Sequence, residues 1–162
     1  MKGDPKVVRV LNQVLRKELT GINQYFVHAK MCDNWGYSVL AKHARNESID
    51  EMRHAEAVID RILFLDGTPN MVEMDKLLVG KSVREQLESD LALEQAALTV
   101  LVPGIGVCNE ADDHGSRDLL ERIVKDEEEH IGWLEAQLHQ IKEMGYENYL
   151  TLQVGDLKGG EK

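Results

Sequence analysis

Thiols are scarce in this sequence. Its 162 residues include only two cysteines, Cys32 and Cys108, and these form no Cys-x-x-Cys pair. The chain therefore offers neither the thiolate set of a structural zinc site nor the cysteine pairs of a rubredoxin-like iron site. We interpret both cysteines as thiols that pack between helices in a reducing compartment.

The sequence also lacks an excess of positive charge, and we expect no long apolar run. No stretch approaches an uninterrupted transmembrane length, and the start MKGDPKVVRV has no apolar signal-peptide segment. The formal net charge of -10 argues against nucleic-acid binding, which normally leaves a basic footprint. We therefore expect a soluble cytoplasmic protein with no nucleic-acid partner and no membrane partner.

Glutamates and histidines, in contrast, recur with the same spacing in both halves of the chain. Glu18 to Glu51 and Glu94 to Glu127 are both separations of 33 residues, and each second glutamate opens a Glu-x-x-His triplet. Residues i and i+3 of a helix share a face, so each triplet presents a carboxylate and an imidazole to one point. Two lone glutamates on further helices complete the ligand set known for di-iron carboxylate bundles. The predicted ligands are Glu18, Glu51, His54, Glu94, Glu127 and His130.

Apolar residues at helical spacing place these ligands on buried faces. Val14 and Ile22 flank Glu18 at four residues on either side, and Leu91 and Leu98 bracket Glu94. Burying several carboxylates costs several kcal/mol each unless a cation compensates them. The alternative is that solvated helix charges fall on apolar faces by chance, which six matched positions disfavour. The sequence therefore predicts a metal site.

The ligand types favour iron or manganese over structural zinc, because the set contains four carboxylates, two imidazoles and no thiolate. Two carboxylate-bridged divalent ions are the expected occupancy, with open positions for dioxygen or peroxide. Around them, Asp90 lies one turn before Glu94 on the same face. Asp50 and Asp126 each precede a ligand histidine by four residues and either accept its N–H or face water. Tyr25 either reaches a ligand through its hydroxyl or is a half-buried core aromatic.

Capping and turn residues predict an all-α protein. Asp4-Pro5 begins the first helix, Ser82 with Glu85 forms a capping box before the third, and Gly145 ends the fourth. The segment between the second and third helices is too long for a hairpin, so it must run the length of a four-helix bundle. Residues 1–154 are predicted to form one domain, followed by a flexible tail, 155–162. The predicted helices span 5–34, 38–65, 82–110 and 116–144, with a short fifth helix over 146–154.

With these features in place, the chain closely resembles bacterioferritin over residues 1–154. The resemblance implies a ferritin-like bundle, a di-iron ferroxidase centre made by the same six ligands, and a 24-subunit shell of two-fold dimers around a ferric mineral. The stretches that carry it are MKGDPKVV, INQYF, NWG, ESIDEMRHAE, RILFLDGTPN, DLALEQ, DEEEHIGWLEAQL and ENYL.

Met52 follows Glu51 directly and points about 100° away around the helix, toward a neighbouring element. At a two-fold interface a residue near the axis meets its own copy, so two thioethers could hold one haem iron. From the residues alone, packing in a dimer interface is the favoured interpretation. The resemblance implies instead that Met52 is an axial ligand of haem b, which would pass electrons from a ferredoxin to the mineral.

Three positions depart from the usual family pattern. Asn46 stands where several relatives have a histidine proposed, with the residue at position 50, to help iron pass from the centre to the cavity. Pro103 falls inside the third helix and should kink it. Val58 replaces an aromatic residue of some relatives, which leaves Trp133 as a candidate electron relay or a core residue.

The predicted function is iron storage and detoxification, with ferroxidase activity that uses O2 or H2O2. One alternative is a small di-iron oxidase or peroxidase without a storage role, similar to rubrerythrins. The missing cysteine pairs and the fifth helix argue against it. A second alternative is a structural shell subunit that depends on a catalytic partner chain, against which the complete ligand set argues.

Overall fold

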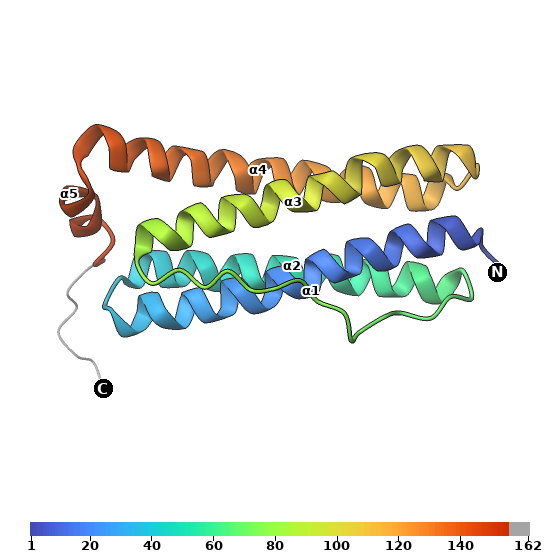
Figure 1. Ribbon diagram of the computed structural model, residues 1–162, viewed down its shortest axis with the longest axis horizontal. Helices are drawn as coiled ribbons and strands as arrows, with labels where there is room; N and C mark the ends of the chain where they lie inside the picture. The colour runs from blue at the N-terminus through green and yellow to red at the C-terminus, as the bar shows by residue number, and fades with distance from the viewer. Residues whose placement is uncertain (156–162) are drawn as a thin grey trace.

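Four long antiparallel helices form two hairpins that pack side by side in the computed structural model, which describes residues 1–155 (Figure 1). The first hairpin pairs α1 (Pro5–Asn34) with α2 (Ser38–Phe64), and the second pairs α3 (Val83–Glu110) with α4 (His114–Met144). The hairpins meet mainly through α1 and α3. A short helix, α5 (Tyr146–Thr151), lies across one end of the bundle, against α4. The predicted all-α bundle with a short fifth helix is confirmed.

The helix ends follow the predicted capping residues closely. Asp4 accepts a hydrogen bond from the Lys6 amide, and Ser82 accepts one from the Glu85 amide. The fourth helix starts earlier than predicted, at His114, because Asp113 caps it by accepting from the Ser116 amide at 2.9 Å. The fifth helix ends earlier than predicted, at Thr151. Residues 156–162 of the predicted flexible tail lie outside the described residues.

The core at one end of the bundle is packed with aliphatic side chains from all four long helices. Leu11, Leu15, Ile62, Leu101 and Leu120 are each at most 1% exposed. Full burial of one such side chain contributes roughly 1.5–3 kcal/mol. This packing gives the carboxylates of the neighbouring layer a rigid, dry frame.

Helix α3 is the most apolar of the long helices. Among the described residues it alone is long and apolar enough to cross a bilayer, so the prediction that no stretch approaches that length was wrong. Its inward face, however, carries the buried side chains of Asp90 and Glu94 and packs against α1 and α4. We therefore interpret α3 as a core helix of the bundle. It continues as one α-helix through Pro103.

The crossover between α2 and α3 runs the length of the bundle, as predicted, and a polar stripe on α1 holds it (Figure 1). The stripe residues recur every four positions and so share one helix face. Asn12 bonds to Thr68 and Asn70, and Arg16 pairs with Asp75 at 2.7 Å. Three further stripe residues accept backbone amides of the crossover: Thr20 from Asp75, Gln24 from Leu78 and His28 from Gly80.

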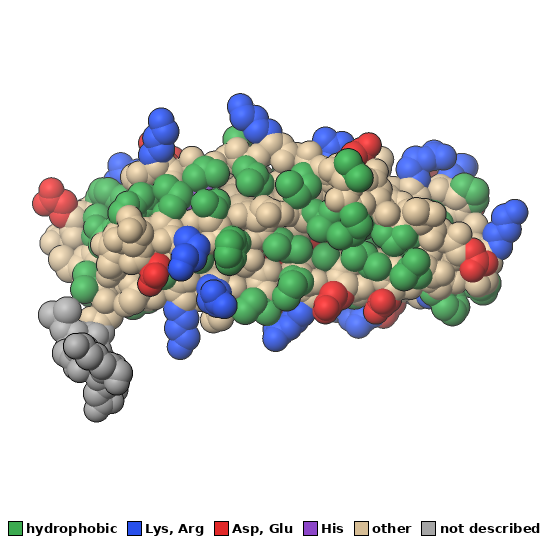
Figure 2. All heavy atoms as spheres, turned by 90° about the horizontal axis from the view of Figure 1, so that it is seen from below, with side chains coloured by type: hydrophobic (Ala, Val, Ile, Leu, Met, Phe, Trp, Pro, Cys, Tyr) green, Lys and Arg blue, Asp and Glu red, His purple; other side chains and the backbone are tan. Residues whose placement is uncertain are grey.

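Apolar side chains gather on the face where α1, α2 and the crossover lie (Figure 2). Exposed large apolar residues of these elements are Phe26, Val39, Met52, Leu63, Phe64, Met71, Val72, Met74, Leu78 and Val79. An apolar area of this kind usually marks a protein interface.

Candidate metal centre

The six predicted ligands converge in the middle of the bundle from four different helices. Their ligand atoms form two groups in which every atom lies within 4.8 Å of the others. The groups consist of Glu18, Glu51, His54 and Glu127, and of Glu51, Glu94, Glu127 and His130. Glu51 and Glu127 belong to both groups, so they are placed to bridge two ions.

The histidines face these carboxylates through Nδ1. His54 Nδ1 lies 3.3 Å from Glu18 Oε2 and 3.1 Å from Glu127 Oε1. His130 Nδ1 lies 3.3 Å from Glu94 Oε1. The two imidazole centroids are 6.4 Å apart, on either side of the shared carboxylates.

Several buried polar atoms at this centre have no hydrogen-bond partner within the described residues. Buried polar groups in proteins are nearly always paired, so such a concentration needs an explanation. Two divalent cations would satisfy these atoms and offset four carboxylate charges. The unpaired atoms are Glu18 Oε1, Glu51 Oε1, Glu94 Oε2, both carboxylate oxygens of Glu127, and His130 Nδ1.

A second carboxylate orients each histidine through Nε2. Asp126 lies 2.9 Å from His54 Nε2, and Glu47 lies 3.0 Å from His130 Nε2. A proton on Nε2 leaves the Nδ1 lone pair free for a cation. The two interpretations of Asp126 were that it accepts from His130 on its own helix or that it faces water. The structure instead pairs it with His54 across the bundle, because residues i and i+4 stack along the helix axis while the site lies between helices.

Asp50 does not orient His54 either. It pairs with Arg53 at 2.8 Å and forms a third cluster with Glu47 and His130, whose ligand atoms lie within 4.8 Å of one another. Glu47 is only 8% exposed, and its Oε2, the atom 3.0 Å from His130 Nε2, makes an ion-pair contact there but no hydrogen bond within the described residues. Helical spacing places Glu47 on the same face as Glu51 and His54, but spacing alone indicates no role for it.

In the metal-free protein, bound protons offset part of the negative charge of this cluster. Burial lowers the pKa of His54, but the nearby carboxylates of Glu127, Glu18 and Asp126 outweigh it and raise the pKa to about 11. The pKa of His130 is likewise raised to about 9, chiefly by Glu94. Burial, assisted by Glu127, raises the pKa of Glu94 to about 8. Cations therefore compete with protons for these ligands.

Tyr25 reaches the centre, as one of its two interpretations predicted. It is fully buried, and its hydroxyl donates to Glu94 Oε1. Asp90 does not contact a ligand. It accepts hydrogen bonds from Gln24 at 2.9 Å and from His28 at 2.8 Å, and so joins α3 to the polar stripe on α1.

The centre opens to the surface beside the two histidines. A cavity of about 300 Å³ is lined by Asp50, Arg53, His54, Asp126, Glu129 and His130. Its acidic rim provides a polar entrance that suits cations.

The centre has an approximate internal two-fold symmetry with an offset of 76 residues. The offset relates Glu18 to Glu94, Glu51 to Glu127 and His54 to His130. Asp50 and Asp126, which lie beside His130 and His54, follow it as well, but other neighbours do not. Beside Glu94 and His130 stand Tyr25, His43 and Glu47, whereas the positions offset from these by 76 are the buried apolar residues Leu101, Leu119 and Ile123.

The remaining predicted residues lie away from the centre. Met52 is 47% exposed on α2, whereas its neighbour Glu51 is 2% exposed, in keeping with their different directions. Asn46 is exposed and Val58 is buried in the core. Trp133 is half-buried and stacks on His43 with ring centroids 3.4 Å apart.

Comparison with known proteins gives matches along most of the chain. A family model described as a ferritin-like domain matches residues 8–144. A bacterioferritin of Mycobacterium tuberculosis is 56% identical over 149 residues, which cover 92% of this chain and 94% of that protein. The bacterioferritin of Streptomyces coelicolor is 48% identical over 93% of this chain and 90% of that protein. The bacterioferritin of Rhodobacter capsulatus is 42% identical over 99% of this chain and 100% of that protein.

Proposed function

This chain belongs to the bacterioferritins, a family of ferritin-like iron-storage proteins, and from that premise we propose that it oxidises Fe²⁺ at the Glu–His centre and deposits ferric mineral inside a shell. The observation that carries the proposal is the cluster of unpaired buried carboxylate oxygens, arranged in two groups that share Glu51 and Glu127. Two Fe²⁺ ions are the substrates that match these groups.

Each residue of the centre has a definite task in this reaction. Glu18 with His54, and Glu94 with His130, each complete one iron position, while Glu51 and Glu127 contribute to both. Carboxylates favour Fe³⁺ over Fe²⁺ because the product carries the higher charge. Two ferrous ions supply two electrons, which with two protons convert O2 to H2O2, or H2O2 to two waters.

The residues around the ligands control geometry and protons. Asp126 and Glu47 hold the imidazoles with Nδ1 toward the iron positions. Incoming Fe²⁺ displaces protons from His54, His130 and Glu94, whose pKa values are raised in the metal-free protein. The acidic entrance beside Asp126 admits the ions.

Met52 is the residue that would hold a haem shared between two copies of the chain. It is 47% exposed on α2, so a second copy packed there could complete the site with its own thioether. When bound, haem b supplies one-electron transfer for the reductive release of stored iron. A ferredoxin is the proposed electron donor, and two-fold dimers built on this face are the proposed units of a cytoplasmic 24-subunit shell.

An aerobic Fe²⁺ titration followed by size exclusion tests storage. We expect iron to co-elute with a large assembly far beyond the roughly two ions per chain that the bundle site can hold. Uptake that stops near two ions per chain would contradict storage and favour a di-iron redox enzyme.

Stopped-flow oxidation tests the centre itself. Glu127→Ala removes a carboxylate common to both groups, so rapid Fe²⁺ oxidation should fall at least about 100-fold while the shell still assembles. Glu128→Ala, at the neighbouring exposed position, is the matched control. Equal rates in the two variants would refute the assignment.

The proposed haem ligand is tested separately. Met52→His should change the haem spectrum or occupancy and leave Fe²⁺ oxidation nearly intact, because Met52 lies outside both ligand groups. An unchanged haem content and spectrum would exclude Met52 as the ligand.

A further inference from the structure

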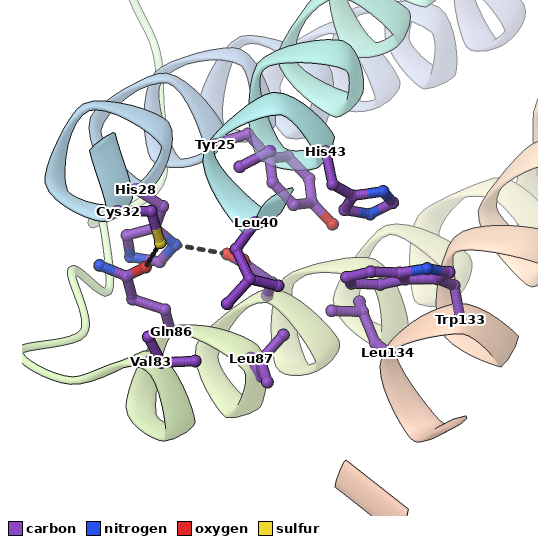
Figure 3. Close-up of a pocket in the computed structure, with 12 residues that line it drawn as sticks. Tyr25, His28, Cys32, Leu40, His43, Val83, Gln86, Leu87, Trp133 and Leu134 are labelled. Carbon is purple, nitrogen blue, oxygen red and sulfur yellow. Dashed lines mark hydrogen bonds and ion pairs between the residues drawn. The ribbon is translucent and has the colours of Figure 1, made fainter. Parts of the chain in front are cut away.

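A small cavity lies beside one half of the metal centre, between α1, α2, α3 and α4 (Figure 3). Its volume is about 20 Å³, which matches one water molecule or one diatomic molecule. Leu40, Leu87 and Leu134 line it together with the ring of Tyr25. The stacked rings of His43 and Trp133 form its half-exposed side.

Most polar groups around the cavity are already engaged with one another. Figure 3 shows that the His28 ring bonds to Asp90 and the Cys32 thiol to Gln86. The other nitrogen of His28 accepts from the Gly80 amide, and the Tyr25 hydroxyl donates to Glu94.

Among the lining groups of residues 1–155, the Asp90 Oδ2 oxygen and the ring nitrogens of His43 and Trp133 make no hydrogen bond within the protein. The rest of the lining is mostly apolar, with Leu40, Leu87 and Leu134. A small apolar molecule needs no polar partner, so this lining suits one.

The cavity is one side chain away from the iron ligands. Tyr25 separates it from Glu94, and on the other side His43 Nε2 lies 3.6 Å from Glu47, which contacts His130. A molecule held here lies next to the position made by Glu94 and His130, with the Tyr25 side chain between them.

The cavity breaks the internal two-fold symmetry of the centre. Three lining residues, Tyr25, His43 and Asp90, correspond at the 76-residue offset to Leu101, Leu119 and Val14. These are at most 7% exposed and belong to the solid core cluster. The cavity therefore lies beside only one of the two ligand groups. The matching place beside the other group is filled by core side chains, so the bundle can pack without such a cavity.

We propose that this cavity is a binding site for dioxygen, which it holds beside the Glu94–His130 position for reaction with ferrous iron. The inference rests on the proposed ferroxidase function and adds to it the oxidant and its side of approach. Hydrogen peroxide, being polar, reaches the centre through the acidic entrance beside Asp50 and Asp126 instead.

Xenon tests the binding site without iron chemistry. In the metal-free protein, ¹²⁹Xe NMR under xenon pressure should show a saturable shift that Leu87→Phe removes, because the larger ring fills the cavity. Leu119→Phe makes the same enlargement in the core away from the cavity and should retain the shift. A shift absent from the wild type, or equal in both variants, would overturn the proposal. So would a crystal structure with an ordered water in this cavity.

Oxygen kinetics connect the cavity to catalysis. Leu87→Phe should raise the KM for dioxygen about fivefold or more, with kcat at saturating oxygen changed by less than about twofold. The rate with hydrogen peroxide should stay at the wild-type value. An unchanged KM for dioxygen would refute the cavity's role even if peroxide still oxidises iron. Failure of the wild type to oxidise Fe²⁺ with either oxidant would instead refute the ferroxidase function and leave the xenon result intact.

Discussion

Replacing Glu94 by glutamine should stabilise the metal-free protein, although Glu94 is a proposed ligand. The pKa of Glu94 is about 8 in the folded protein, against 4.5 for an ordinary glutamate, because the side chain is completely buried. At pH 7 folding therefore takes up a proton, which costs about 3 kcal/mol at 1.36 kcal/mol per pKa unit. Glutamine mimics the protonated side chain and still accepts from the Tyr25 hydroxyl.

Thermal melting of the metal-free protein measures this effect. A gain of about 3 kcal/mol corresponds to a rise of roughly 6–12 °C for a chain of this size. The sign of the pH dependence follows from the raised pKa. The contribution of Glu94 to stability is fully present below pH 4.5 and is lost as pH rises through 8, so the difference between the proteins should shrink to about 1 kcal/mol at pH 5.

Glu88→Gln, an exposed change on the same helix, should leave the melting temperature within about 2 °C of the wild type. Saturating Co²⁺ should reverse the order, because the wild type then binds metal with its full ligand set and the Glu94→Gln variant does not. A metal-free variant that melts at or below the wild type at pH 7, or a difference that persists at pH 5, would refute this reasoning.

Three further changes test the surroundings of the centre. Gly21→Ala places a Cβ 2.6 Å from Glu51 Oε2, so the carboxylate must move, and Co²⁺ titration should show about tenfold weaker binding with the fold retained. Asp126→Asn should weaken Co²⁺ binding about 10–100-fold at the His54 position, since the imidazole loses its orienting carboxylate; two equally affected binding steps would contradict this. His28→Leu should leave the Gly80 amide without its acceptor, cost about 1–3 kcal/mol and accelerate hydrogen exchange in the crossover; unchanged exchange there would show that the stripe does not hold it.

The ligand set could be predicted from the sequence because helical periodicity determines which residues share a face. Glu-x-x-His and the lone glutamates therefore converge once the helices pack, and the caps at Asp4 and Ser82 fix where the helices begin. The pairing of Asp126 with His54 was not predictable, because it depends on the crossing of α2 and α4 and not on spacing within one helix.

The crossover contacts carried a sequence signal that went unused. Polar residues at 12, 16, 20, 24 and 28 lie at a strict four-residue spacing, which indicates a single polar face beside the buried one. The cavity beside Tyr25 had no such signal, because a void of this size depends on how side chains from four helices meet.

The 76-residue offset also bears on how a centre of this kind can diversify. A single hairpin with one lone glutamate and one Glu-x-x-His triplet would complete the same ligand set by pairing with its own duplicate, but any substitution would then appear twice. Joining two copies through the crossover removes that obligation. One half of the chain has Leu101 and Leu119 as packing residues, whereas the other half has Tyr25 and His43 at the matching places. With both halves in one chain, one ligand group can change its surroundings while the other keeps its own.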